Sequence, residues 1–236
     1  MTTLVQCEIE SSVASITMDD GKVNALSLRM LGELNAALDR AAAEQAIVVL
    51  GGRPGVFSAG FDLPVLRAGG WEAITMFRAG FELAERLLSY PRPVVIACSG
   101  HAMAMGAFLL LSGDYRIGTR GAFKLAANEV AIGVTMPRAA VEILAQRLNP
   151  ACFTRATLLA ETFSPDNAIE AGFFDRVVDA AELRPTAAQV VAMVSALDAP
   201  AFAATKLRAR QRMLASIRSG IETDHVELCR LFAPRG

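Results

Sequence analysis

Alternating apolar and polar residues predict a strand near the start of the chain, followed by a turn and a helix. Residues 13–18 alternate as a half-buried strand requires, and residues 19–22 (DDGK) then supply turn residues. From Ser27, which can cap a helix, to about Glu44, apolar residues recur at helical spacing. We therefore expect a hairpin or a loop exit after the strand, and then an amphipathic helix.

Two short apolar runs further on are typical of strands that are buried on both faces of a parallel sheet. Residues 46–50 form the first run, which ends at a pair of glycines, and residues 93–98 form the second. Between them, residues 74–88 show helical periodicity. The order strand, helix, strand, helix predicts a layered α/β domain with right-handed crossovers.

The second half of the chain is dominated by helical patterns. Residues 103–112 are apolar nearly all round and predict a central buried helix, and residues 137–148 predict a helix with proline in its first turn. Residues 164–172 resemble a short helix that ends at a glycine C-cap, before strand-like residues 177–178.

After about residue 190 only helical patterns remain. We expect a core of residues 1–190 and a C-terminal helical region of residues 191–236.

Composition excludes several classes of partner and site. A chain of 236 residues with 53% hydrophobic residues and a net charge of -1 can bury a full core and offers no basic surface for nucleic acid or an anionic membrane. The four cysteines are widely spaced and only two histidines occur, so neither a disulfide framework nor a zinc or other metal site is indicated. With no export signal or membrane-spanning run in the sequence, we expect a cytoplasmic protein with reduced thiols.

Two turns rich in small residues are the first candidates for chemistry, since the common nucleotide, zinc-peptidase and serine-hydrolase motifs are missing from the sequence. Residues 57–63 (FSAGFDL) and residues 100–106 (GHAMAMG) each follow a predicted buried strand. Small residues let backbone N–H groups approach a ligand, and two amides that converge on one point form an oxyanion hole. Taken singly, either turn could equally serve packing or chain reversal.

Together with four further segments, these turns resemble the enoyl-CoA hydratase/isomerase family, the crotonase superfamily, over nearly the whole chain. The segments occur in family order at residues 22–27 (KVNALS), 57–63 (FSAGFDL), 91–97 (PRPVVIA), 100–102 (GHA), 128–133 (NEVAIG) and 168–172 (AIEAG). The resemblance implies a crotonase-type spiral of ββα units with a C-terminal helical region. It also implies an acyl-CoA substrate with no separate cofactor, and a homotrimer or a dimer of trimers.

The resemblance assigns the oxyanion amides to Phe61 and Met105. It also implies a substrate-binding set drawn from the same motifs, namely Lys22, Ala25, Ser58, Gly60, Asp62, Leu63, Ala104 and Phe108. Because the oxyanion donors are amides, we expect Ser58→Ala to keep most activity.

One position departs from the hydratase pattern. Hydratases of the family use two glutamates, because water must be activated while a proton is delivered to the adjacent carbon. Here Phe108 stands where the first glutamate is expected, whereas Glu129 occupies the second position. A single carboxylate is sufficient for isomerising a 3-enoyl-CoA to a 2-enoyl-CoA, so the sequence favours an isomerase with Glu129 as its base.

Other interpretations stay open. The chain could be a hydratase whose missing carboxylate is replaced or dispensable, or an acyl-CoA-binding protein that has lost turnover. Asp62 and Asp114 suit structural roles in loops and helix ends, and His101 suits packing or a backbone hydrogen bond. Lys206 and Arg208 could bind CoA phosphates, but a solvated helix face explains them more simply.

Overall fold

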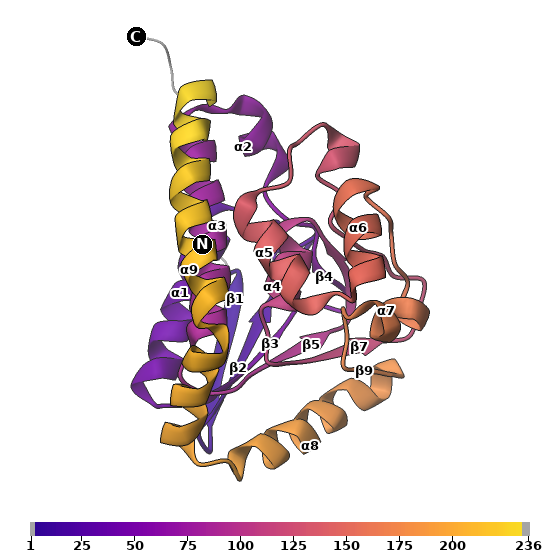
Figure 1. The fold of residues 1–236 in the computed structure, drawn as a ribbon. Helices are drawn as coiled ribbons and strands as arrows, with labels where there is room; N and C mark the ends of the chain where they lie inside the picture. Colours follow the sequence, from indigo (N-terminus) through magenta and orange to yellow (C-terminus); the bar gives the residue numbers. More distant parts are fainter. Residues whose placement is uncertain (1–2, 233–236) are drawn as a thin grey trace.

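The fold is a series of strand-strand-helix units, seen in a computed structural model that describes residues 3–232 (Figure 1). Two strands precede each of the first helices. The units are β1 (Val5–Glu10), β2 (Val13–Met18) and α1 (Leu28–Ala43); β3 (Ile47–Gly51), β4 (Gly55–Ser58), α2 (Leu63–Ala68) and α3 (Gly70–Ser89); β5 (Val94–Cys98), β6 (Gly100–Met103) and α4 (Met105–Leu111); and β7 (Tyr115–Thr119), β8 (Leu125–Ala126), the 3₁₀ turn η1 (Val130–Ile132) and α5 (Arg138–Arg147).

The strands form two sheets, and successive units add to both. The larger sheet has the order β1-β2-β3-β5-β7-β9 and the smaller sheet has the order β4-β6-β8. From β3 onward, each unit places its first strand in the larger sheet and its second strand in the smaller one, and these neighbours pair in parallel. The expected α/β spiral of ββα units is therefore confirmed.

The remaining elements lead to the C-terminal helices. They are α6 (Pro150–Leu158), α7 (Pro165–Ala171), β9 (Arg176–Val178), η2 (Ala180–Glu182), α8 (Leu183–Ser195) and α9 (Ala199–Phe232). Helix α8 packs on β3, β5 and β7, and the long helix α9 runs along α3 and α5 (Figure 1). The boundary expected at residue 190 falls inside α8, and residues 233–236 of the expected C-terminal region lie outside the described part.

Local signals explain most of these elements. Ser27 caps α1 by accepting a hydrogen bond from the Met30 amide at 3.2 Å, and α4 is buried along its whole length. Strand β1 was not expected from the sequence. It pairs with β2 across Ser11 and Ser12, both of which have positive φ, and serine gives little sign of such a tight hairpin turn.

Among the described residues, no single helix is long and apolar enough to cross a membrane. Within residues 3–232, one bent pair of helices, 180–195 and 199–231, meets the length and composition criterion when the two are taken together.

Candidate active site

The two small-residue turns predicted from the sequence lie in direct contact. Gly60 follows β4 with a φ of +90°, and Ala104 precedes α4 with a φ of +49°. A Cβ atom on Gly60 would lie 2.9 Å from the Ala104 Cβ and 3.2 Å from the Met105 nitrogen. Only glycine fits this contact without a shift of the second turn, so the close approach brings the amides of Phe61 and Met105 to one place.

Among the described residues, the two amides have no hydrogen-bond acceptor, and Met105 is fully buried. Met105 is the first residue of α4, so its N–H has no partner within the helix. Neither the Phe61 nor the Met105 N–H donates to an acceptor within the described residues. Two adjacent unpaired amides can donate to one oxygen atom, which is the arrangement that an oxyanion hole requires.

Glu129 follows β8, the strand that pairs with β6. Ala126 pairs with Met103, and its carbonyl accepts a hydrogen bond from the Ala104 amide at 2.8 Å. Glu129 is the third residue after Ala126, so their Cα atoms are at most about 10 Å apart. The second sheet therefore places the strand that leads to Glu129 beside the turn that carries the Met105 amide.

Glu129 is buried and its carboxylate is poorly satisfied. The residue is 7% exposed, and its Oε2 atom has no hydrogen-bond partner among the described residues. Burial raises the pKa of the Glu129 carboxyl to about 7, with a smaller opposing effect from its own backbone amide. A carboxyl group that titrates near neutral pH can both accept and return a proton, which suits a general acid-base residue.

Aromatic rings close the space around the amides. Phe108, in α4, is 1% exposed and stacks on Phe81 at 5.9 Å between ring centroids. The ring of Phe61 stacks on Phe77 at 5.7 Å and lies against Gly80, where an added Cβ would come within 2.4 Å of it. This wall is apolar and presents no carboxylate at position 108.

With this geometry, the comparisons with known proteins decide the family. The sequence matches the enoyl-CoA hydratase/isomerase family over residues 8–225. The chain belongs to this family. An enoyl-CoA hydratase/isomerase family protein from Pseudomonas syringae has a similar structure, with a TM-score of 0.93 and 43% identity over 95% of this chain and 98% of that one. The crotonase-type fold is thereby established.

Relatives within the enoyl-CoA hydratase/isomerase family carry both activity names. The structure of an enoyl-CoA isomerase from Mycobacterium tuberculosis is 48% identical, with a TM-score of 0.90 over 94% of this chain and 97% of that one. The human mitochondrial enoyl-CoA delta isomerase 1 is 30% identical over 88% of this chain and 70% of its own length. A probable enoyl-CoA hydratase from Rhodobacter capsulatus is 38% identical over 50% of this chain and 47% of its own length. The names alone do not separate the two activities.

Several residues predicted to bind substrate use their polar groups within the protein. The Ser58 hydroxyl is buried and donates to the Asn24 carbonyl at 2.8 Å, and Asp62 caps α2 through the Val65 amide at 3.5 Å. The Ala25 amide donates to the Asp20 carboxylate at 3.0 Å. The Lys22 side chain is exposed, as is Leu63 at the start of α2.

Two predictions about residues outside the site have different outcomes. His101 accepts a hydrogen bond from the Lys124 amide at 3.0 Å, which is the backbone hydrogen bond that the sequence suggested for it as one of two roles. The solvated helix face expected for Lys206 is wrong. Lys206 is 7% exposed and its Nζ lies 2.7 Å from Asp114, because this face of α9 packs onto the core. Arg208 is exposed, as that interpretation requires.

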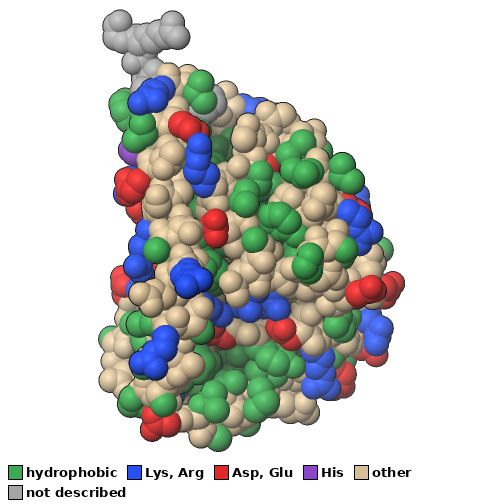
Figure 2. All heavy atoms as spheres, viewed as in Figure 1, with side chains coloured by type: hydrophobic (Ala, Val, Ile, Leu, Met, Phe, Trp, Pro, Cys, Tyr) green, Lys and Arg blue, Asp and Glu red, His purple; other side chains and the backbone are tan. Residues whose placement is uncertain are grey.

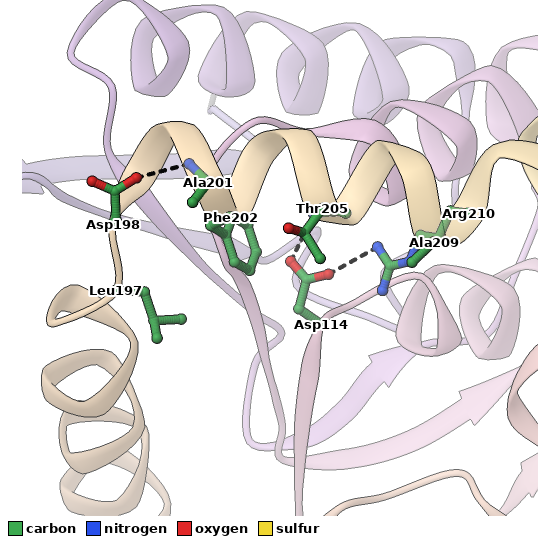
Figure 3. A pocket seen from close by; sticks show the side chains of 9 residues that line it. Asp114, Leu197, Asp198, Ala201, Phe202, Thr205, Ala209 and Arg210 are labelled. Carbon is green, nitrogen blue, oxygen red and sulfur yellow. Dashed lines mark hydrogen bonds and ion pairs between the residues drawn. The ribbon is translucent and has the colours of Figure 1, made fainter.

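Two cavities in the structure lie away from Glu129 and from the amides of Phe61 and Met105. One of about 400 Å³ lies beside the α8–α9 junction and is lined by Asp114, Phe202 and Arg210, among others (Figure 3). The other, of about 1200 Å³, lies between α8 and the larger sheet. Neither is lined by Phe61, Met105 or Glu129.

Apolar side chains gather on the surface near the site. Figure 2 shows them on the face that carries α5 and α6 in Figure 1. Val130, Ile132 and Val134, which directly follow Glu129, are 45%, 52% and 41% exposed, and Leu158 and Leu159 at the end of α6 are exposed as well. A patch of this kind often marks a protein interface.

Sequence reasoning missed Asp20 and Asn24. Asn24 is fully buried, and it makes hydrogen bonds to the loop that carries Gly60. The available signal was a cluster of Asp, Gly and Asn before Ser27, since side chains of Asp and Asn often bond to nearby backbone groups.

Proposed function

We propose that this chain isomerises 3-enoyl-CoA to 2-enoyl-CoA. In this mechanism the thioester oxygen accepts hydrogen bonds from the Phe61 and Met105 amides. The Glu129 carboxylate removes a proton from C2, and the electron pair spreads over a dienolate whose oxygen carries the charge. The protonated Glu129 then returns the proton to C4, so the double bond moves from C3–C4 to C2–C3 and no atom is gained or lost.

The observation that carries this proposal is the state of Glu129. Its carboxyl group is buried, has an unpartnered Oε2 and a pKa of about 7. At neutral pH such a group is divided between its two protonation states, so its affinity for a proton suits both removal from C2 and delivery to C4. One residue of this kind is enough for a reaction in which the same proton leaves and returns.

The surroundings of Phe108 support an isomerase over a hydratase. Adding water to a 2-enoyl thioester needs a group that activates water and a group that delivers a proton. Helix α4 has no acidic residue, and Phe108 packs on Phe81 where a second carboxylate would be needed. An apolar wall also keeps water away from the dienolate, which protects it from side reactions.

The alternative is an enoyl-CoA hydratase that uses a single carboxylate, and the probable hydratases among the relatives favour it. A chain that binds acyl-CoA without turnover is a third outcome.

Product analysis distinguishes these functions. The purified chain is incubated separately with a 3-enoyl-CoA and a 2-enoyl-CoA of equal length, and the thioesters are separated by chromatography. We expect interconversion of the two without 3-hydroxyacyl-CoA. Formation of 3-hydroxyacyl-CoA at a comparable rate would establish the hydratase. Unchanged thioesters, together with measurable binding, would establish the non-catalytic protein.

A further inference from the structure

The loop that ends in the oxyanion amide of Phe61 is held by the segment of residues 20–26, which lies before α1. The Leu26 amide donates to the Gly60 carbonyl at 2.8 Å, and the Ala59 amide donates to the Val23 carbonyl at 3.0 Å. Residues 58–60 are thus hydrogen-bonded along their length to this segment. The position of the Phe61 N–H depends on this segment.

Asn24 is the centre of the segment. Its side-chain amide donates to the Met18 carbonyl at 3.0 Å and to the Phe57 carbonyl at 3.1 Å, while its Oδ1 accepts from the Asp20 amide at 3.0 Å. These bonds join the end of β2 to β4 inside the protein, where Asn24 has no exposed surface. Asparagine is one of the few residues that adopt its φ of +52° readily.

A short relay continues from Asn24 to the oxyanion loop. The Asn24 carbonyl accepts a hydrogen bond from the Ser58 hydroxyl at 2.8 Å, and that hydroxyl accepts one from the Gly60 amide at 3.1 Å. Gly60 is the residue whose peptide bond supplies the Phe61 N–H. Each member of the relay is buried, so the loss of one partner would leave a buried polar group unsatisfied.

Asp20 stabilises the same segment through its carboxylate. Its carboxylate accepts the amides of Lys22, Asn24 and Ala25 at 2.7, 2.9 and 3.0 Å. Burial acts to raise the pKa of Asp20, but these amides prevail and hold it below its ordinary value. The carboxylate therefore stays ionised and keeps the turn around Asn24 closed.

We propose that Asn24 is a positioning residue for the oxyanion hole, acting through Ser58 and Gly60 to aim the Phe61 N–H at the thioester oxygen. This inference rests on the proposed thioester-binding site, but not on which reaction follows enolate formation. It also changes the expectation for Ser58. The hydroxyl is not dispensable in this arrangement, because its loss leaves the Gly60 amide without an acceptor and frees the peptide that precedes Phe61.

Two variants test the relay. Asn24→Gly removes the side-chain bonds, yet glycine adopts a positive φ without strain, so the backbone path is retained. Ser58→Ala breaks the relay one step later and leaves Asn24 in place. The matched control is Asn149→Ala, since Asn149 bonds the backbone in the same way, through the Cys152 amide and the Glu170 carbonyl, at the start of α6.

The readout is the polarisation of a bound thioester, which does not require turnover. Each protein is saturated with hexanoyl-CoA labelled with carbon-13 at the thioester carbonyl, and the carbonyl resonance is recorded. In the wild type we expect a downfield shift from the value in water. Asn24→Gly and Ser58→Ala should lose at least about half of that shift, whereas Asn149→Ala should retain it, even if all three are less stable.

In steady-state kinetics, the kcat of Asn24→Gly and of Ser58→Ala should fall roughly 10- to 100-fold, with KM within about 3-fold of the wild type. This is expected when a transition-state contact is misplaced.

The outcomes separate this inference from the proposed function. A wild type without a carbonyl shift would overturn the oxyanion hole itself. A shift in the wild type that persists in both folded variants would overturn the role of Asn24 and leave the oxyanion hole standing. If Asn24→Gly does not fold, Ser58→Ala decides, because it removes a single oxygen atom. A normal shift and a normal kcat in that variant would refute the relay.

Discussion

The burial of Glu129 makes a prediction about stability that can be tested without knowing the substrate. Burial raises the pKa of this carboxyl from 4.5 to about 7. Between these values the folded chain keeps a proton that the unfolded chain has released. Wild-type stability should therefore fall as the pH rises from 4.5 to about 7, and level off above it.

The size of the effect follows from the same shift. Each unit of pKa difference corresponds to about 1.4 kcal/mol, so the contribution of Glu129 changes by roughly 2.5 kcal/mol between about pH 5 and about pH 8. Glu129→Gln has the same shape and no titration. The stability of this variant relative to the wild type should therefore improve by roughly 2.5 kcal/mol over that range. Any fixed cost of burying the amide cancels in the comparison of the two pH values.

Chemical denaturation followed by circular dichroism measures this difference, at equal protomer concentration because association would shift the midpoints. Glu10→Gln is the matched control, since Glu10 is exposed at the end of β1 and has no side-chain partner among the described residues. The control should follow the wild type at every pH. A gap between Glu129→Gln and the wild type that stays constant within about 0.5 kcal/mol across the range would refute the desolvation of Glu129.

The same group should govern activity. The kcat/KM of the wild type should rise with pH to a plateau, with a midpoint near the pKa of about 7, because the base acts in its ionised form. Glu129→Gln should lose nearly all turnover while acyl-CoA affinity stays within a few-fold. An active Glu129→Gln enzyme would remove the mechanism, even if the stability prediction holds.

Four further predictions concern other parts of the chain. Phe61→Pro deletes an oxyanion N–H and should lower turnover roughly 100-fold or more in steady-state kinetics. A folded variant with wild-type turnover would contradict the assignment of the Phe61 amide as a donor. Phe108→Glu should lower the free energy of unfolding by roughly 3 kcal/mol, as chemical denaturation will measure. It should form at most traces of 3-hydroxyacyl-CoA, because a carboxyl in this apolar site stays protonated. Robust hydration by the wild type would show that Phe108 is misinterpreted. Asp114→Asn should lower the free energy of unfolding by roughly 3 kcal/mol or more, since Lys206 and Arg210 lose their buried counter-charge. Lys206→Met should cost far less. Equal losses for the two variants in thermal or chemical unfolding argue against the ion pair. Light scattering should give a trimeric or hexameric mass, as the exposed apolar face suggests, and a monomeric mass at micromolar concentration rules this out.

Much of the fold could be predicted from the sequence because its signals are local. A cap and a repeating apolar stripe define α1, whose N-cap Ser27 was correct to the residue. The apolar run before Gly51 and the all-apolar run of α4 likewise became a buried strand and a buried helix. These patterns work because a helix or strand exposes its side chains with a fixed period, and burial selects the residue types on one face.

The pairing of distant groups depended on the tertiary structure. That Ser58 serves Gly60 and Asn24, and that Lys206 is buried on Asp114, follows from packing between segments far apart in the chain. The sequence could nominate Glu129 as a base, but only its enclosure among other elements raises its pKa towards 7. A pattern along the chain records which residues prefer burial, whereas hydrogen-bond partners and desolvation depend on which surfaces meet in space.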